Sequence, residues 1–189
     1  MPFRTRTNPK QPTFHINDDP ARLDQAYRNM LGRDGDQLFS EEVKWLAVTH
    51  KSFDQGRRGF NDRLAYLGRR IVEMQCSLAL LDAPKPHLED TSQLLAEQDP
   101  ALEGLNNITR FAKAQTLDKR RLSELAQQYG IGGVVRWQPR KVENLQSSGI
   151  DLVLAHTIYA IVGAVSLQKG GDVARQIVRE RILQPLGLR

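Results

Sequence analysis

Cysteine is nearly absent from the sequence, and long apolar runs are missing from it. The only cysteine, Cys76, lies in the apolar run MQCSLALL, so an internal disulfide and a multi-cysteine zinc site are both excluded. We expect the Cys76 thiol to pack in the core. Apolar runs stay well below the roughly 18 consecutive residues of a transmembrane helix, and no membrane span is expected.

Strand-like alternation of apolar and polar residues does not appear at any length, and phosphate-cradling glycine motifs are missing as well. The stretch GIGGVVRWQPRKVEN, residues 130–144, fits neither GxxxxGK[ST] nor GxGxxG. We interpret it as a turn followed by a basic connector. Apolar residues recur instead at helical spacing. The sequence therefore predicts an all-α fold of about seven helices.

Acidic residues are missing from the first 17 positions, MPFRTRTNPKQPTFHIN. The prolines there disfavour a helix, and we expect residues 1–17 to form an extended basic arm. An acid-free start is compatible with organelle import and also with a basic tail that stays unfolded. Residues 18–189 suffice for one compact domain.

Overall composition is that of a globular protein with a basic balance. Apolar residues make up 40% of the chain and charged residues 26%, so the chain should fold. The net charge is +5 and the pI is near 9.6. This balance favours an acidic partner such as nucleic acid, although many proteins with a similar charge bind no polyanion.

Capping residues mark the expected helices. Expected helix starts are Asp18 or Asp19 before Pro20, Ser40, Asn61, Asp99 before Pro100, Asp118, Ser147 or Ser148, and Asp172. Expected stops are Gly32, Gly130, Gly170 with Gly171, and Pro185. Residues 83–100 are expected to form a loop with a short helix at 88–96.

Three apolar stripes should face the core. The clearest is the helix from Asn61, with Leu64, Leu67, Ile71, Met74 and Leu78 at steps of three and four. The helix after Asp99 should turn Leu102, Leu105, Ile108 and Phe111 inward. The longest apolar stretch, residues 150–167, should form a second core helix.

Four separated segments share the order and spacing of a known family. They are LAVTHKSF (46–53), NDRLAYLG (61–68), NNITRFAKAQTLDKRRLSELAQQYGIGGVVRW (106–137) and LAHTIYAIVGAVSLQKGG (154–171). Together they resemble the endonuclease domain of ribonuclease III, over about 130 residues. The resemblance implies the helical fold of that domain and a dimer interface at the helix from Asn61.

An active member of that family needs carboxylates, because Mg²⁺ prefers hard oxygen ligands and must be held against the scissile phosphate. In the family, two crossing helices each contribute two acids. The matching positions here are Ala65, Arg69, His156 and Tyr159, and none is a carboxylate. We therefore predict no catalytic residue, no metal site and no cofactor, with His156 packed or hydrogen-bonded.

Two acids near the first motif could in principle replace the lost ones. Asp62 and Glu73 are eleven residues apart, about 16 Å along a helix, which is too far to share one ion. We expect them to be solvated or paired with neighbouring arginines.

Basic residues around the motif are candidates for RNA contact, because guanidinium groups suit phosphate oxygens and tryptophan can stack on an unpaired base. The alternative is a solvated basic face with Trp137 in the core. The candidates are Arg57, Arg58, Arg69, Arg70, Arg136, Trp137, Arg140 and Lys141.

Only 18 residues follow Gly171, which leaves no room for the double-stranded RNA-binding domain of active enzymes. With the missing acids and the basic start, the chain most resembles the ribonuclease III-like proteins in the large subunit of fungal mitochondrial ribosomes. That resemblance implies a structural protein of the mitochondrial matrix, bound to ribosomal RNA and to other large-subunit proteins. One of these would be a second ribonuclease III-like protein as heterodimer partner. The alternative is the inactive subunit of a heterodimeric RNA-processing nuclease; a stand-alone active nuclease is disfavoured.

Overall fold

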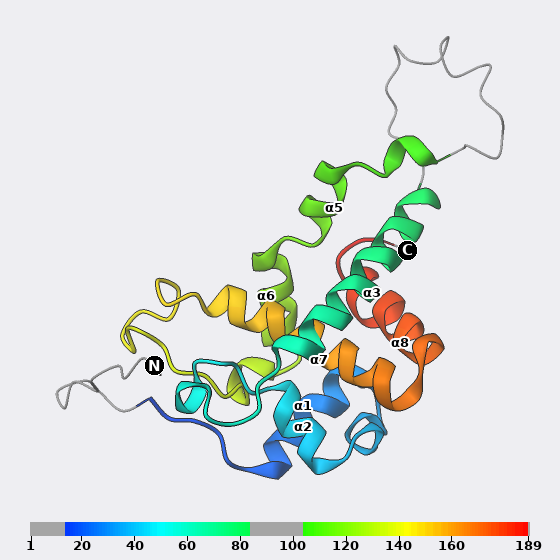
Figure 1. Cartoon of the computed structure of the whole chain (residues 1–189). Coiled ribbons are helices and arrows are strands. Elements are labelled where there is room, and N and C mark those ends of the chain that lie inside the picture. The colour runs from blue at the N-terminus through cyan, green and yellow to red at the C-terminus, as the bar shows by residue number, and fades with distance from the viewer. Residues whose placement is uncertain (1–13, 84–103, 189) are drawn as a thin grey trace, which may run out of the picture.

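The computed structural model describes residues 14–83 and 104–188, which form a helical fold (Figure 1). Within these ranges the α-helices are α1 (Pro20–Leu31), α2 (Glu41–Ala47), α3 (Asp62–Leu81), α5 (Arg110–Thr116), α6 (Lys119–Gln128), α7 (Ile150–Lys169) and α8 (Gly171–Val178). Short 3-10 turns are η1 (Gly35–Leu38), η2 (Phe53–Gly56), η4 (Leu105–Asn107) and η5 (Ile131–Gly133), and a π-helical turn, η6 (Arg179–Leu183), continues α8. Strand pairing in the described part of the chain is limited to one isolated bridge. The predicted all-α fold of about seven helices is confirmed.

Helix α7 lies at the centre of the fold, packed against α3, α6 and α8 (Figure 1). Twelve of its 20 residues are buried. By length and composition α7 would also suit a membrane span, but 67% of its most apolar window is buried against the rest of the chain. Such coverage on most sides is typical of a core helix.

Two glycines let α3 and α7 approach at backbone distance. A Cβ on Gly68 of α3 would lie 1.8 Å from the Tyr159 carbonyl oxygen. A Cβ on Gly163 of α7 would lie 2.1 Å from the Leu64 carbonyl oxygen. The obstructing atoms belong to helix backbones, which cannot rotate away as a side chain can. This crossing therefore requires glycine on both helices, and it sets the relative position of the two motif segments.

The buried face of α3 differs from the predicted one. Of the five residues in the predicted stripe, Leu64 is buried, whereas Met74 is 61% exposed and Leu78 38% exposed. The face that packs in the fold carries mostly smaller residues, because α7 comes so close. Its buried residues are Leu64, Ala65, Gly68, Val72, Gln75, Cys76, Ala79 and Leu80. The expected core position of Cys76 is thus confirmed, and the apolar stripe lies mainly on the uncovered flank.

Several predicted caps are confirmed. Asp19 caps α1 by accepting a hydrogen bond from the Ala21 N–H, and Asp118 caps α6 through the Arg120 N–H. Gly130 follows α6 in the left-handed conformation, with φ 79°, which suits the residue after a helix end.

Two predicted helix starts are wrong. Helix α7 begins after Gly149, at φ 88°, while the Ser148 hydroxyl bonds the backbone of Lys141 and stabilises the preceding loop. Helix α8 begins at Gly171, so Asp172 lies inside its first turn.

The start predicted at Asp99 and the short helix at 88–96 lie outside the described residues. Among the described ones, the segment after Gly104 is a 3-10 turn and then α5, which Thr109 caps through the Ala112 N–H. Leu105 is 49% exposed and Phe111 77% exposed. Their predicted inward position is therefore wrong, because Leu105 and Phe111 belong to two separate elements and not to the one continuous helix that the spacing assumed.

Candidate functional site

A groove of about 430 Å³ opens where the first turns of α3 meet α7. The four positions that the sequence motifs match to metal ligands of ribonuclease III all line it: Ala65, Arg69, His156 and Tyr159. The sequence therefore correctly placed these positions on two crossing helices. Lys119 of α6 and the half-buried Leu117 also line the groove, and neither was singled out from the sequence.

Asp62 is engaged at the end of this groove. One oxygen lies 3.0 Å from His156 Nε2, and the other lies 3.5 Å from Lys51 Nζ. The expectation that His156 is hydrogen-bonded is confirmed. Asp62 was expected to be solvated or paired with arginines, and that is wrong, because histidine and lysine side chains reach it from other elements.

Glu73 pairs with two of the arginines of α3. Its carboxylate accepts a hydrogen bond of 2.8 Å from Arg69 Nε and one of 2.9 Å from Arg70 Nη1. Spacings of four and three residues place these groups on one helix face. The pairing of Glu73 with neighbouring arginines was expected and is confirmed.

The residues of the groove do not fit a hard divalent cation. Asp62 is the one carboxylate in its lining, and it already has two partners. Within residues 14–83 and 104–188, no group of three His, Cys, Asp or Glu side chains is placed to hold a metal ion. Mg²⁺ needs several oxygen ligands, and the Arg69 guanidinium would oppose it at close range.

A second histidine, His50, which was not singled out from the sequence, lies behind His156. The His50 and His156 rings meet edge to face, with centroids 6.2 Å apart. Burial, and then the neighbouring His156 and Lys51, lower the pKa of His50 to about 4, with Asp62 opposing the shift. Burial also lowers the pKa of His156, against the pull of Asp62. Burial raises the pKa of Tyr159 to about 12, against the effect of Arg69. The groove thus favours neutral side chains at these positions.

The lowered pKa of His50 predicts a pH-dependent stability. Folding disfavours the protonated imidazole, so the contribution of neutral His50 is present above the ordinary pKa of about 6.5. It is lost as the pH falls towards about 4. We expect the free energy of unfolding to fall less steeply between these values in His50→Asn, whose side-chain oxygen can still accept from the Ser52 N–H. Urea titrations at several pH values measure this.

The matched control for that experiment is His15→Asn, because His15 is exposed. The free energy of unfolding of His15→Asn should change with pH in parallel with that of the wild type. If the free energy of unfolding fell equally steeply with pH in the wild type and in His50→Asn, His50 would not be the source of the pH dependence.

Two of the predicted RNA-contacting residues are structural. Trp137 is 2% exposed and packs edge-on against Phe14, with centroids 5.8 Å apart. It therefore cannot stack on a base in this conformation, and the alternative of a core tryptophan is correct. The Arg136 guanidinium lies 3.6 Å from the Trp45 ring centroid and pairs with Asp18 at 2.9 Å. Arg136 ties the residues before α1 to the connector.

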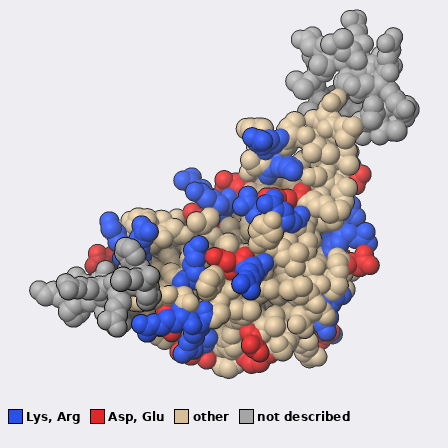
Figure 2. Space-filling view, in the orientation of Figure 1, with Lys and Arg blue, Asp and Glu red and all other residues tan. Residues whose placement is uncertain are grey.

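The other predicted RNA-contacting residues are exposed. They are Arg57, Arg58, Arg69, Arg70, Arg140 and Lys141. Arg58 pairs loosely with Asp54 at 3.6 Å. Figure 2 shows lysine and arginine side chains distributed from the α5 end to the loop that precedes α3, with acids between them. The exposed cations Arg63, Lys119 and Arg120 add to this surface, and they were not among the residues singled out from the sequence.

One flank of α3 is apolar and uncovered by the described chain. Tyr66 is 68% exposed, with the Arg70 guanidinium 5.3 Å from its ring centroid. Met74 and Leu78 continue this flank, and Leu67 and Ile71 border it, half-buried. Arg70 lies between Tyr66 and Met74 on this flank, so the surface combines apolar and aromatic side chains with an arginine, as protein interfaces often do.

Comparisons with known proteins agree with this geometry. A family model described as Ribonuclease-III-like matches residues 40–186. The large ribosomal subunit protein mL57 of Neurospora crassa is 42% identical over 182 residues, which cover 95% of this chain and 68% of that protein. Ribonuclease 3 of Vibrio vulnificus is 29% identical over 147 residues, covering 76% of this chain and 55% of the enzyme.

Among solved structures, the nuclease domain of ribonuclease III from Campylobacter jejuni superposes with a TM-score of 0.59 at 18% identity, covering 92% of this chain and 99% of that one. At this identity the likeness concerns the fold alone. The match of the family model over most of the length is the stronger observation, and the chain belongs to the ribonuclease-III-like family.

Proposed function

We propose that this chain is a catalytically inactive, structural protein of the mitochondrial large ribosomal subunit. It contacts ribosomal RNA and pairs with a second ribonuclease-III-like protein. The observation that supports the proposal is the groove between α3 and α7, which is lined by Ala65, Arg69, His156 and Tyr159. The sequence motifs match these four positions to the family's metal ligands, and none of the four is a carboxylate. The ribosomal relative, 42% identical over 95% of this chain, supports the cellular role.

Inactivity follows from the groove's charge. A phosphodiesterase of this family holds its metal with acids from both helices, whereas the single acid here pairs with Lys51 and is hydrogen-bonded to His156. The helix packing around the groove is meanwhile intact, with Gly68 and Gly163 at the crossing. A role in assembly needs the folded surface and does not need the metal-binding acids.

Contact with RNA is supported by the exposed cations around the groove. Arg57 and Arg58 stand on the loop before α3, and both are exposed. We expect Arg57→Glu with Arg58→Glu to weaken binding of a short double-stranded RNA and to lower the slope of log affinity against log salt by about 2, roughly one per lost phosphate contact. Fluorescence anisotropy over a salt series measures both quantities.

The double variant Arg22→Glu with Arg33→Glu is the control, since it makes the same charge change at exposed positions on and after α1. It should leave the slope near that of the wild type. If the two double variants lose affinity equally, net charge rather than this surface governs binding.

A protein partner is supported by the apolar flank of α3. Met74 and Tyr66 are each more than 60% exposed, and this is costly in water unless the surface is covered. The flank begins beside the groove, so a partner of the same fold would place its own groove next to this one. That arrangement also suits the second candidate, an inactive half of a nuclease whose partner keeps its acids.

Sedimentation separates these two functions. Mitochondria are lysed, ribosomes are washed with salt and the subunits are resolved on a sucrose gradient. We expect the chain to co-migrate with the large subunit after a wash that removes loosely bound factors. Recovery only in light fractions, in a complex that cleaves RNA, would establish the nuclease-subunit role instead.

A further inference from the structure

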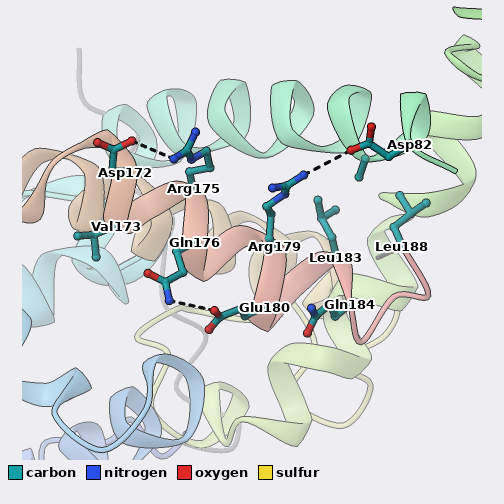
Figure 3. Close-up of a pocket in the computed structure, with 11 residues that line it drawn as sticks. Asp82, Asp172, Val173, Arg175, Gln176, Arg179, Glu180, Leu183, Gln184 and Leu188 are labelled. Carbon is teal, nitrogen blue, oxygen red and sulfur yellow. Dashed lines mark hydrogen bonds and ion pairs between the residues drawn. The ribbon is translucent and has the colours of Figure 1, made fainter. Parts of the chain in front are cut away.

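A second groove lies where the C-terminal end of α3 meets α8 and η6 (Figure 3). Its volume is about 760 Å³, and it shares no lining residue with the groove between α3 and α7. Nothing in the proposed function so far uses it.

An unusual helical turn builds one wall of this groove. In η6 the Gln184 N–H donates to the Arg179 carbonyl oxygen at 3.0 Å, a five-residue spacing that defines a π-helix. Single π-turns are rare and are frequent at functional sites. Arg179, Glu180 and Leu183 of this turn all line the groove. The π-helical turn therefore forms part of the groove wall.

The charges of the groove oppose the charge of the chain. Three carboxylates, Asp82, Asp172 and Glu180, face two guanidinium groups in a protein whose net charge is +5. Figure 3 shows Arg175 and Arg179 along the side next to α3. Arg175 lies 3.3 Å from Asp172, and Arg179 lies 3.6 Å from Asp82. These two pairs leave Glu180 as the uncompensated charge of the lining, which disfavours a polyanion and favours a basic ligand.

Apolar side chains lie at the two ends of the groove. Val173 is 38% exposed at one end of the groove, and the half-buried Leu188 lies at the other. Gln176 is held by Glu180 through a hydrogen bond of 2.9 Å, so the polar rim is ordered. A hollow with apolar surface and a charged rim suits the apolar face of an amphipathic polypeptide.

We propose that this groove docks a basic amphipathic segment of a neighbouring protein. The segment places apolar side chains against Val173 and Leu188 and lysine or arginine side chains against Asp172 and Glu180. This inference rests on the proposed function, because the assembled subunit supplies the neighbour. It adds an interface separate from the apolar flank of α3.

Site-specific cross-linking tests the proposal. A photo-reactive amino acid replaces Val173 in the chain. The variant is expressed in the organism that naturally makes this protein. Large subunits are isolated, irradiated and analysed by mass spectrometry. We expect one adduct, with a peptide of another protein that contains lysine or arginine beside apolar residues. Asp172→Lys with Glu180→Lys should lower the adduct yield roughly tenfold or more, since like charges then meet.

Glu124→Lys with Glu143→Lys is the matched control, because both acids are exposed and lie outside the groove. It should leave the yield unchanged. An adduct with RNA or with this chain itself, no adduct, or a yield insensitive to the groove reversal would overturn the proposal. Absence of the chain from the large subunit would instead refute the proposed function, and the docking inference with it.

Discussion

Gly68→Ala and Gly163→Ala are each expected to destabilise the protein by more than about 3 kcal/mol, which is a large share of the 5–15 kcal/mol that typically holds a domain folded. The added methyl groups would lie 1.8 Å from the Tyr159 carbonyl oxygen and 2.1 Å from the Leu64 carbonyl oxygen. Both oxygens belong to helix backbones, so relief requires α3 and α7 to move apart. Urea denaturation followed by circular dichroism measures the loss.

Gly171→Ala is the control for this experiment. Gly171 is the first residue of α8, and a Cβ there would meet nothing within 4 Å. Alanine has the higher helix propensity, so stability should stay the same or rise by a few tenths of a kcal/mol. If Gly68→Ala and Gly171→Ala gave similar midpoints, the close crossing would be refuted.

The same crossing explains which parts of the fold were predictable. Helix existence followed from apolar spacing and caps such as Asp19 and Asp118, because these signals are local. The buried face of α3 was not predictable from hydrophobicity. The partner helix approaches too closely for leucine, so Gly68 and Ala65 are inside while Met74 is outside. The apolar stripe of α3, which was the strongest periodic pattern in the sequence, thus lies mainly on the surface of the fold.

The residues of the candidate site also fall into a predictable and an unpredictable group. Motif spacing correctly brought Ala65 and Arg69 to His156 and Tyr159, because each pair lies on one helix and the helices cross. The groove's other neighbours come from distant elements. His50 and Lys51 precede α3, and Lys119 begins α6. Such contacts between elements leave no spacing signal in the sequence.

The two tryptophans show a further limit. A basic context made Trp137 a candidate for stacking on RNA, yet its ring is buried against Phe14. Arg136 beside it stacks on Trp45. An arginine next to an aromatic ring has the same sequence pattern whether the pair binds nucleic acid or closes the core. Exposure, which only the fold determines, separates the two.

The second large expected effect concerns metal binding. A variant with Ala65→Glu, Arg69→Asp, His156→Asp and Tyr159→Glu gathers four added carboxylates in the groove beside Asp62. Without metal these acids repel one another, and we expect a lower Tm than that of the wild type. Mn²⁺ should restore stability by about 2.7 kcal/mol at a hundredfold excess over its Kd. Differential scanning calorimetry with and without Mn²⁺ measures this.

The wild type should show no such response, and it should not cleave double-stranded RNA with Mg²⁺ or Mn²⁺. Cleavage by the purified wild type that Asp62→Ala abolishes would contradict inactivity. The thermal response is informative even if the variant remains inactive, because ligation needs only the acids, while cleavage also needs correctly placed RNA and a second subunit. A response in the four-acid variant alone would mean that the groove keeps its shape for a metal and lacks only the ligands. The difference from a metal-binding groove would then lie in the side chains at these four positions, with the helix crossing at Gly68 and Gly163 unchanged.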